Sequence, residues 1–333
     1  MEQDLVDILL ATYNSDIEYL KLQIDSILCQ TYKNIHLIIS DDASTQQNVK
    51  DVLKEYEQKD SRIEVFLNEK NVGYINNFEF LLKKSNAKYI AFADHDDIWY
   101  ENKIEECIKA LKEENVDLVY SDCHQIDEKG KILNESYLKY KNMPIINGKN
   151  NILAFSRHIA IGCSTVFTSQ IKDQMLPFSQ NVMAHDWLNV YLASKQNGIA
   201  CIEKPLFGYR IHSSNEFGGR SLNQNLNKWK SENENSNKYN VFKKYRKERV
   251  INKAYLSGSK MCLEYRDKLN LHKDERENKV INYYNKLLKS NVINFKFITY
   301  NKYLSFKGIG KRKIKEIMIF HFPIISYIVY RFK

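Results

Sequence analysis

The sequence predicts an α/β fold with a mainly parallel central sheet, and three observations lead to this prediction. Apolar runs without polar alternation recur along the first 125 residues, a pattern typical of strands that are buried on both faces. A segment with helical apolar periodicity follows most of these runs. Acidic residues come directly after two of the runs, at the strand ends where open α/β sheets bind their ligands.

The elements alternate in chain order. The expected strands are 6–11, 35–40, 63–67, 89–93 and 117–121. The expected helices are 15–28, 47–58, 75–84 and 101–114. Ser15 or Asp16 is the expected N-cap of the first helix. Repeated β–α–β units favour parallel strands joined by right-handed crossovers.

The charge divides the chain near residue 224. Residues 225–333 hold 26 Lys and Arg against 9 Asp and Glu, a net charge of +17, whereas residues 1–224 carry a net charge of −8. We therefore expect an α/β domain over 1–224 and a basic, mostly helical region over 225–333, with helices at 239–262 and 275–289. A basic half suits nucleic acid or an anionic membrane, and it is also typical of a solvated helical surface.

The last segment and the cysteines bear on the compartment. Residues 309–333 combine basic residues with a short apolar, aromatic run, which indicates either a membrane-interface segment or a last core element. We expect no secretion signal, since the start of the chain is acidic, and no membrane-spanning helix. The six cysteines show no Cys-x-x-Cys spacing, which favours reduced thiols in the cytoplasm over a disulfide frame or a zinc site.

The carboxylate cluster Asp94, Asp96 and Asp97 follows the apolar run 89–93. Like charges this close repel unless a cation or a hydrogen-bond network takes up the charge. Two carboxylates one residue apart, with substrate phosphates, are a usual way to hold Mg²⁺ or Mn²⁺. The alternative is an acidic turn that caps the next helix. Because neither a Gly-x-Gly-x-x-Gly fingerprint nor a Gly-Lys-Ser/Thr loop occurs, a nucleotide site here must be built from side chains and metal.

A series of short strings occurs in a specific order. The strings are Ala-Thr-Tyr-Asn (11–14), Ser-Ile-Leu-Cys-Gln-Thr-Tyr (26–32), Asp-Asp-Ala-Ser (41–44), Asn-Val-Gly (71–73), Asp-His-Asp-Asp-Ile-Trp (94–99), Gly-Cys-Ser (162–164), His-Asp-Trp (185–187) and Tyr-Arg-Ile-His (209–212). The series resembles the family 2 inverting glycosyltransferases of GT-A fold over residues 5 to about 217. The strings from 94 onward look most like the bacterial rhamnosyltransferase-like branch. The resemblance implies a GT-A nucleotide-sugar domain over residues 1–224.

The resemblance also implies a nucleotide site. Its expected residues are Ala11, Tyr13, Asp41, Asp42, Asn71, Gly73 and Asp94. A carboxylate can accept the N3–H of uracil or thymine, and by position Asp42 is the first choice for this contact, with Asp41 beside it. Tyr13 would stack on the base. The alternatives are an ordinary turn for the two acids and core packing for Tyr13.

The diphosphate and metal residues follow from the same resemblance. Asp96 and His212 are the expected ligands of Mn²⁺ or Mg²⁺, whose task is to neutralise the departing diphosphate. Asp94 would hold ribose or a metal-bound water. Asp97 would contact the donor or acceptor sugar or cap the next helix. Arg210 is also assigned to the sugar donor, with a guanidinium fork suited to phosphate.

Asp186 matches the position of the family's catalytic base. An inverting transfer needs a carboxylate beside the acceptor hydroxyl, opposite the leaving group, and the transition state resembles an oxocarbenium ion. The alternative for Asp186 is a helix N-cap. Trp187 would wall the acceptor site, since aromatic faces suit sugar C–H surfaces, and a core tryptophan is the alternative.

These observations lead to a functional expectation. The chain would transfer a sugar from a UDP- or dTDP-sugar, with dTDP-rhamnose first, to a hydroxyl of a cell-surface polysaccharide precursor linked to a polyprenyl diphosphate lipid. Its place would be the cytoplasm, peripheral at the inner face of the plasma membrane, without a nucleic-acid partner. A UDP-hexose or UDP-N-acetylhexosamine transferase of the same family is the alternative. A non-catalytic protein that binds an anionic surface or nucleic acid is the alternative from another class.

Overall fold

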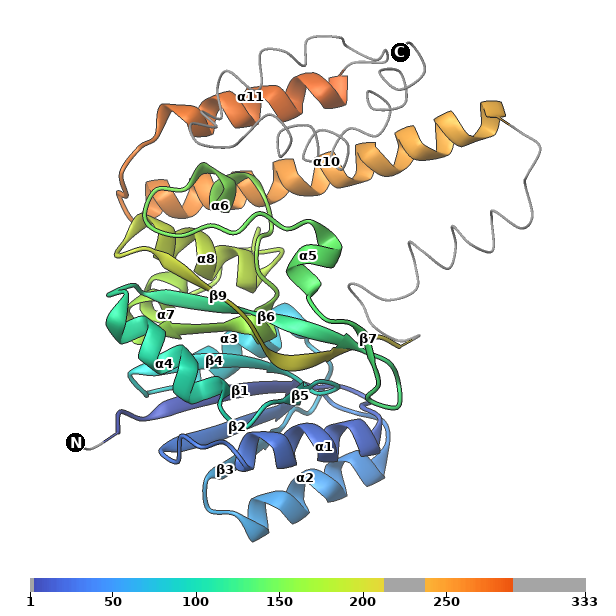
Figure 1. Cartoon of the computed structure of the whole chain (residues 1–333), viewed down its shortest axis with the longest axis vertical. Coiled ribbons are helices and arrows are strands. Elements are labelled where there is room, and N and C mark those ends of the chain that lie inside the picture. The colour runs from blue at the N-terminus through green and yellow to red at the C-terminus, as the bar shows by residue number, and fades with distance from the viewer. Residues whose placement is uncertain (1–2, 213–236, 290–333) are drawn as a thin grey trace.

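The strand-forming runs build one mixed sheet of nine strands in the part of the chain that the structure describes. The computed structural model describes residues 3–212 and 237–289, with side chains described for 3–212 and 251–288. The path along the sheet is β3-β2-β1-β4-β8-β6-β9-β5, and β7 pairs with β6. Figure 1 shows this sheet in the middle of the molecule, with helices on both faces.

The first four strands form the parallel half that the sequence predicts. They are β1 (Val6–Thr12), β2 (Ile35–Asp41), β3 (Ile63–Leu67) and β4 (Tyr89–Asp94). Parallel pairs join β3 to β2, β2 to β1 and β1 to β4. The pairing sets Ala11 beside Asp94 and Thr12 beside Asp41. The acids expected at strand ends therefore lie at the same edge of the sheet.

The second half of the sheet has mixed directions. Its strands are β5 (Ile98–Trp99), β6 (Leu118–Ile126), β7 (Ile132–Asn134), β8 (Thr165–Thr168) and β9 (Ile199–Arg210). β8 runs antiparallel to both β4 and β6, while β9 runs parallel to β6. Since β8 is reversed, its first residue lies near the carboxyl end of β4. Of this half, sequence periodicity predicted only the start of β6, as the strand expected over 117–121. The other strands were not predicted, because residues 125–220 lack repeated strand–helix units.

Helices cover both faces of the sheet (Figure 1). The helices that follow the first strands are α1 (Ile17–Leu28), α2 (Gln47–Lys59), α3 (Tyr74–Lys84) and α4 (Lys103–Glu113). The middle of the chain forms α5 (Tyr137–Lys141), α6 (Ile152–Ser156), the 3₁₀ turn η1 (Gly162–Ser164), α7 (Ser169–Met175) and α8 (His185–Lys195). Asp16 is the cap of α1, since its carboxylate accepts hydrogen bonds from the backbone N–H groups of Glu18 and Tyr19 at 3.0 and 3.2 Å.

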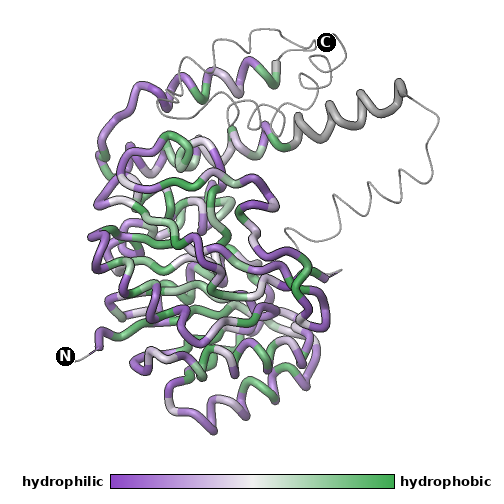
Figure 2. Tube along the Cα trace, viewed as in Figure 1, coloured by the Kyte–Doolittle hydropathy of each residue, from purple (hydrophilic) through white to green (hydrophobic). Residues whose placement is uncertain are grey.

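Alternation along the central strands creates two cores. Ile8 and Leu10 of β1 face the core formed with α1, α2 and α4, while Leu9 faces the core formed with α3, α7 and α8. In Figure 2 the strands in the interior are coloured mainly as hydrophobic and the outer turns as hydrophilic. Both faces of the sheet are thus buried, which explains the unbroken apolar runs.

The C-terminal helices complete the second core. α10 (Asn237–Lys268) and α11 (Glu275–Lys289) lie over α6 and α8. Tyr265 of α10 and Tyr284 of α11 are buried in the same cluster as Tyr191 of α8. The predicted C-terminal helices are therefore present, and their described part is packed on the α/β core. The predicted division at residue 224 stays a prediction, and both that position and residues 309–333 lie outside the described residues.

A buried ion-pair network ties these helices together. Glu277 of α11, 1% exposed, pairs with Lys195 of α8 at 2.6 Å and with Arg266 of α10 at 2.7 Å. Because both cations share one carboxylate, the network holds the end of α8 against both C-terminal helices. Among the described helices we find none with the length and apolar character needed to cross a membrane.

Candidate active site

Three strand ends place their side chains at one edge of the sheet. β1, β2 and β4 are parallel neighbours, and they end at Thr12, Asp41 and Asp94. Asp41 accepts a hydrogen bond from the Thr12 hydroxyl at 3.0 Å and another from the Ser44 backbone N–H at 2.8 Å. The acid of β2 is therefore fixed between the end of its own strand and that of β1.

Asp42 fixes the loop that precedes α3. Its two carboxylate oxygens accept the backbone N–H groups of Val72 and Gly73, each at 2.8 Å. Gly73 has a φ of +83°, which glycine adopts without strain, and the Asn71 carboxamide accepts the same Gly73 N–H at 3.1 Å. The predicted residues Asp42, Asn71 and Gly73 are thus brought together. Since Asp41 and Asp42 are both buried and hydrogen-bonded, a contact with a base would use their remaining acceptor capacity.

Tyr13 is free to meet a ligand. Its side chain follows β1 and is 46% exposed, which excludes the core-packing alternative. The next residue, Asn14, adopts a positive φ of 47°, and its N–H donates to the Ser44 hydroxyl at 2.7 Å. The turn after β1 is therefore held to the turn after β2, with the Tyr13 ring on the outside.

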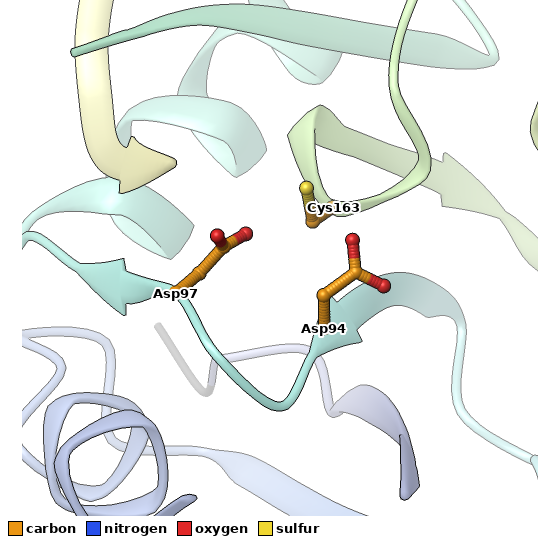
Figure 3. Close-up of side chains that lie close together, drawn as sticks. All are labelled: Asp94, Asp97 and Cys163. Atoms are coloured by element: carbon orange, nitrogen blue, oxygen red, sulfur yellow. The ribbon is translucent and has the colours of Figure 1, made fainter. Parts of the chain in front are cut away.

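Figure 3 shows the Asp94 and Asp97 carboxylates directed toward the Cys163 sulfur. One ligand atom from each of these residues lies within 4.8 Å of the others, the arrangement that a bound metal ion requires. The Arg210 backbone N–H donates to Asp97 Oδ1 at 3.1 Å, whereas Oδ2 is buried without a hydrogen bond in the described part of the chain. Asp94 is the last residue of β4, Asp97 lies in the turn between β4 and β5, and Cys163 comes from η1.

The electrostatics of this group favour a cation. Burial, followed by the charge of Asp96, raises the pKa of Asp94 to about 7. Burial and the charges of Asp96 and Asp94 raise the pKa of Asp97 well above its usual value. These acids oppose one another's ionisation, and a divalent cation would remove that conflict. Carboxylate oxygens suit Mg²⁺ and Mn²⁺, while a thiol suits softer metals.

The two predicted metal ligands lie together. His212 Nε2 is 2.7 Å from Asp96 Oδ2. Burial opposes ionisation of Asp96, but the hydrogen bond with His212 and the charges of His95 and His212 together outweigh burial and lower the pKa of Asp96. The three-residue group of Figure 3 contains Asp97, which we assigned to the sugar, in place of Asp96. Metal binding by Asp96 and His212 therefore remains a prediction, with Asp94 and Asp97 as a second pair of candidates.

Arg210 has a different role from the one expected. Its side chain is 1% exposed, and its guanidinium donates to backbone carbonyl oxygens: Nε to Asp96 at 2.8 Å, and Nη1 to Asp127 and Glu128 at 3.1 and 2.9 Å. The Tyr19 ring lies 4.3 Å from the guanidinium carbon. The assignment of Arg210 to the donor sugar or its phosphate is thus corrected. Arg210 instead joins the backbone of the acidic turn to the backbone of the turn after β6.

Asp186 lies in the first turn of α8, whose N-cap is Ala184, so the N-cap alternative is wrong. Its carboxylate is 2.8 Å from His158 Nε2 and accepts the Gly162 N–H. A Cβ on Gly162 would lie 3.3 Å from His185 Nε2, a tight contact that glycine avoids, and 3.4 Å from Asp186 Cβ, which is ordinary packing. Burial opposes ionisation, but the charge and close contact of His158, with smaller contributions that include the Gly162 N–H, together outweigh burial and lower the pKa of Asp186 to about 2. The predicted base is therefore ionised at neutral pH.

Trp187 does not face the site. Its side chain is 3% exposed, and its indole N–H donates to the Ala154 carbonyl at 2.8 Å. The ring packs against Tyr255 and Gly258 of α10. The predicted acceptor wall is therefore corrected to the alternative, a core tryptophan.

Three residues of the site were not predicted to belong to it: Lys103, His158 and Cys163. Lys103 of α4 is fully buried, donates to the Cys163 carbonyl and lies 3.6 Å from the Trp99 ring centre. Burial lowers the pKa of Lys103 to about 8. The Gly-Cys-Ser string pointed to Cys163 only as part of a motif. No local pattern singles out Lys103 or His158, because their partners are distant in the sequence.

Comparisons with known proteins agree with this geometry. Residues 7–174 match the family model of glycosyl transferase family 2. The chain is 31% identical to an uncharacterized glycosyltransferase of Methanocaldococcus jannaschii, MJ1057, over 68% of this chain and 77% of the relative. It is 30% identical to WfaP of Escherichia coli over 80% of this chain and 99% of the relative. WfaP is named as a UDP-Glc:α-D-GlcNAc-diphosphoundecaprenol β-1,3-glucosyltransferase. An uncharacterized glycosyltransferase of Rickettsia bellii is longer, and the chain spans 29% of its length.

Solved structures share the fold. TarS 1–349 of S. aureus superposes with a TM-score of 0.52 at 15% identity, over 85% of this chain and 71% of that one. The mannosyltransferase PcManGT of Pyrobaculum calidifontis superposes with a TM-score of 0.52 at 13% identity, over 85% and 69%. The strand ends, their acids and these matches lead to one conclusion: the chain belongs to glycosyl transferase family 2, the nucleotide-sugar glycosyltransferases of GT-A-like α/β fold.

Proposed function

We propose that the chain is an inverting, metal-dependent glycosyltransferase that moves a hexosyl group from a UDP-sugar to a hydroxyl of a lipid-linked glycan precursor. The observation that carries this proposal is the convergence of two kinds of carboxylate at one sheet edge. Asp94 and Asp97 form a group that favours a cation. Asp186 is an ionised carboxylate close enough for its charge to help raise the pKa of Asp94.

The acidic turn would hold Mg²⁺ or Mn²⁺ between its carboxylates and the diphosphate of the donor. When bound, this cation supplies the positive charge that stabilises the departing nucleoside diphosphate. Arg210 keeps the turn in place through its bonds to the Asp96, Asp127 and Glu128 carbonyls. Tyr13 would stack on the base, and Asp42 would accept the base N3–H with its remaining lone pairs.

Asp186 would act as the general base. Its carboxylate takes the proton of the acceptor hydroxyl while that oxygen bonds to the anomeric carbon of the donor sugar. The bond from that carbon to the diphosphate oxygen breaks, and its electron pair leaves with the nucleotide. Attack from the face opposite the leaving group inverts the anomeric configuration. Base assistance of this kind contributes roughly 10²–10⁴ in rate.

The relatives support a particular donor. WfaP and WfgD of Escherichia coli, each 30% identical to this chain, are named as glucosyltransferases that use UDP-glucose and an α-GlcNAc-diphosphoundecaprenol acceptor. These names favour the UDP-hexose alternative over dTDP-rhamnose, the donor we expected first. We therefore propose UDP-glucose and a GlcNAc-diphosphate lipid as the first substrates to test.

Ligand binding and transfer are measured in sequence. Thermal unfolding is first followed with UDP, dTDP, GDP and CMP, with and without Mn²⁺, and a ligand at 100 times its dissociation constant adds about 2.7 kcal/mol of stability. Radiolabelled UDP-glucose is then offered with a short-chain α-GlcNAc-diphosphate lipid. We expect Mn²⁺-dependent stabilisation by UDP that Asp97→Asn weakens, and transfer that Asp186→Asn abolishes while UDP binding persists.

Asp173→Asn is the matched control, because this α7 carboxylate is 71% exposed. It should retain both nucleotide binding and transfer. Preference for dTDP would restore dTDP-rhamnose, the donor that we expected first. Absence of any nucleotide effect would refute the proposal in favour of the non-catalytic, anionic-surface alternative.

A further inference from the structure

An imidazole lies against the proposed base although the two residues are far apart in the chain. His158 follows α6, and Asp186 belongs to α8. His158 Nε2 is 2.8 Å from Asp186 Oδ2, and the His158 side chain keeps 37% of its surface exposed. Asp186 is 15% exposed, so its carboxylate is the more enclosed partner of the pair.

The histidine next to Asp186 in the sequence does not supply this charge. The His185 ring stacks on Phe78 with a centroid distance of 4.1 Å and meets the edge of Phe92 at 4.7 Å. Burial among these rings lowers the pKa of His185 to about 4, so it is neutral near pH 7. The positive charge beside the Asp186 carboxylate therefore comes from His158.

We propose that His158 is a positioning residue for Asp186: its imidazolium holds Oδ2 and leaves Oδ1 to meet the acceptor hydroxyl. This inference rests on the proposed function, which gives Asp186 the role of base. The Gly162 N–H also donates to the Asp186 carboxylate. The His158 ion-pair contact and the Gly162 N–H thus hold the carboxylate from two separate segments.

The charge of His158 also affects the pKa of Asp186. The charged and titratable neighbours of the pair are His185 on α8, Asp94 on β4, Tyr137 on α5 and Arg157 on the segment of His158 itself. Burial opposes ionisation of Asp186, and the charge and close contact of His158 are the largest of the contributions that together outweigh burial and lower the pKa of Asp186. In turn, the charge and close contact of Asp186 raise the pKa of this half-buried imidazole. Each partner therefore favours the charged form of the other.

The pair is tested first without any enzyme assay. In protein labelled with ¹³C-histidine, the C2–H signal of His158, assigned by its loss in His158→Asn, is titrated in wild type and in Asp186→Asn. We expect the midpoint to fall by about one pH unit or more in Asp186→Asn, since a carboxylate within about 4 Å shifts a pKa by roughly 1–3 units. An unchanged midpoint would overturn the inference.

Kinetics then separate charge from packing. With UDP-glucose, Mn²⁺ and the α-GlcNAc-diphosphate lipid probe, His158→Ala should lower kcat and move the acid limb of kcat/KM upward by about 1–3 pH units. His158→Asn, which retains a hydrogen-bond donor without the charge, should restore part of kcat and leave the limb displaced. The KM for UDP-glucose should stay unchanged, because His158 contacts Asp186 and does not contact the acidic turn that we propose holds the donor.

A second imidazole–carboxylate pair provides the control. His124 Nε2 lies 3.3 Å from Glu135 Oε2, and the His124 side chain is 20% exposed. His124→Ala should leave the acid limb of kcat/KM where it is in wild type. If wild type transfers sugar and His158→Ala leaves the limb unchanged, this inference alone fails. If wild type transfers no sugar from any nucleotide donor, the proposed function fails together with it.

Discussion

Gly258 of α10 is the position where an ordinarily favourable substitution should harm the protein. In a helix interior, alanine is more stable than glycine by about 1 kcal/mol. An added Cβ at Gly258, however, would lie 2.1 Å from Cζ3 and 2.4 Å from Cη2 of the Trp187 ring. The ring cannot withdraw easily, because it is buried and its indole N–H donates to the Ala154 carbonyl.

The expected magnitude follows from these two opposing contributions. Overpacking of a filled core costs about 1–3 kcal/mol, and contacts this short favour the upper end of that range. After subtraction of the helix-propensity gain of about 1 kcal/mol, Gly258→Ala should lower the free energy of unfolding by about 2 kcal/mol. Because Trp187 follows Asp186 directly, sugar transfer should fall as well.

Urea unfolding, with the m-value checked for constancy, measures this loss. Ser257→Ala is the matched control, since Ser257 is the exposed neighbour on the same helix and should become slightly more stable. Adding Trp187→Phe to Gly258→Ala should recover part of the loss, as expected for two side chains in contact. A Gly258→Ala protein as stable as wild type, or more stable, would refute the described packing of α10 on α8.

Two further predictions concern buried charges. Glu277→Gln leaves two cations, one on α8 and one on α10, with an uncharged partner, and should lower the free energy of unfolding in urea by about 3–5 kcal/mol. Glu275→Gln, at an exposed position of the same helix, should lower it little. Equal losses in the two variants would contradict the buried network. Burial lowers the native pKa of Lys103 from 10.5 to about 8, so between these pH values the unfolded chain binds a proton that the native state has released. Wild-type stability relative to Lys103→Met should therefore rise with pH in this window, by up to about 3 kcal/mol, and a pH-independent difference would refute the burial of a titrating Lys103.

The elements predicted best from the sequence are those whose signal is local. The four parallel strands are recognisable because burial on both faces requires unbroken apolar runs. α11 spans Glu275–Lys289, the same residues that were predicted, because it has a clear apolar face on a polar background. β8 and β9 were missed, since their directions and partners depend on contacts with β6 and β4.

The candidate site was predictable in its acids and less so in their partners. Asp94 and Asp186 stand next to strand or helix boundaries, which a sequence pattern marks. Trp187 and Arg210 were assigned to ligands because their residue types suit sugars and phosphates, yet both are occupied within the protein. Which partner a polar or aromatic side chain takes is decided by segments far away in the chain, and local composition carries no record of that choice.

The packing of α10 and α11 on α8 has a consequence for the order in which the protein can fold during synthesis. Tyr191 of α8 reaches its final surroundings only when Glu277 of α11 is present, because its hydroxyl donates to that carboxylate, 86 residues later in the chain. At roughly 5–20 residues per second, the ribosome takes on the order of ten seconds to make that stretch. The side of α8 that α10 and α11 later cover stays open to water throughout this interval. We therefore expect nascent chains halted before α10 to bind chaperones that recognise apolar surface, and chains extended past α11 to be released from them.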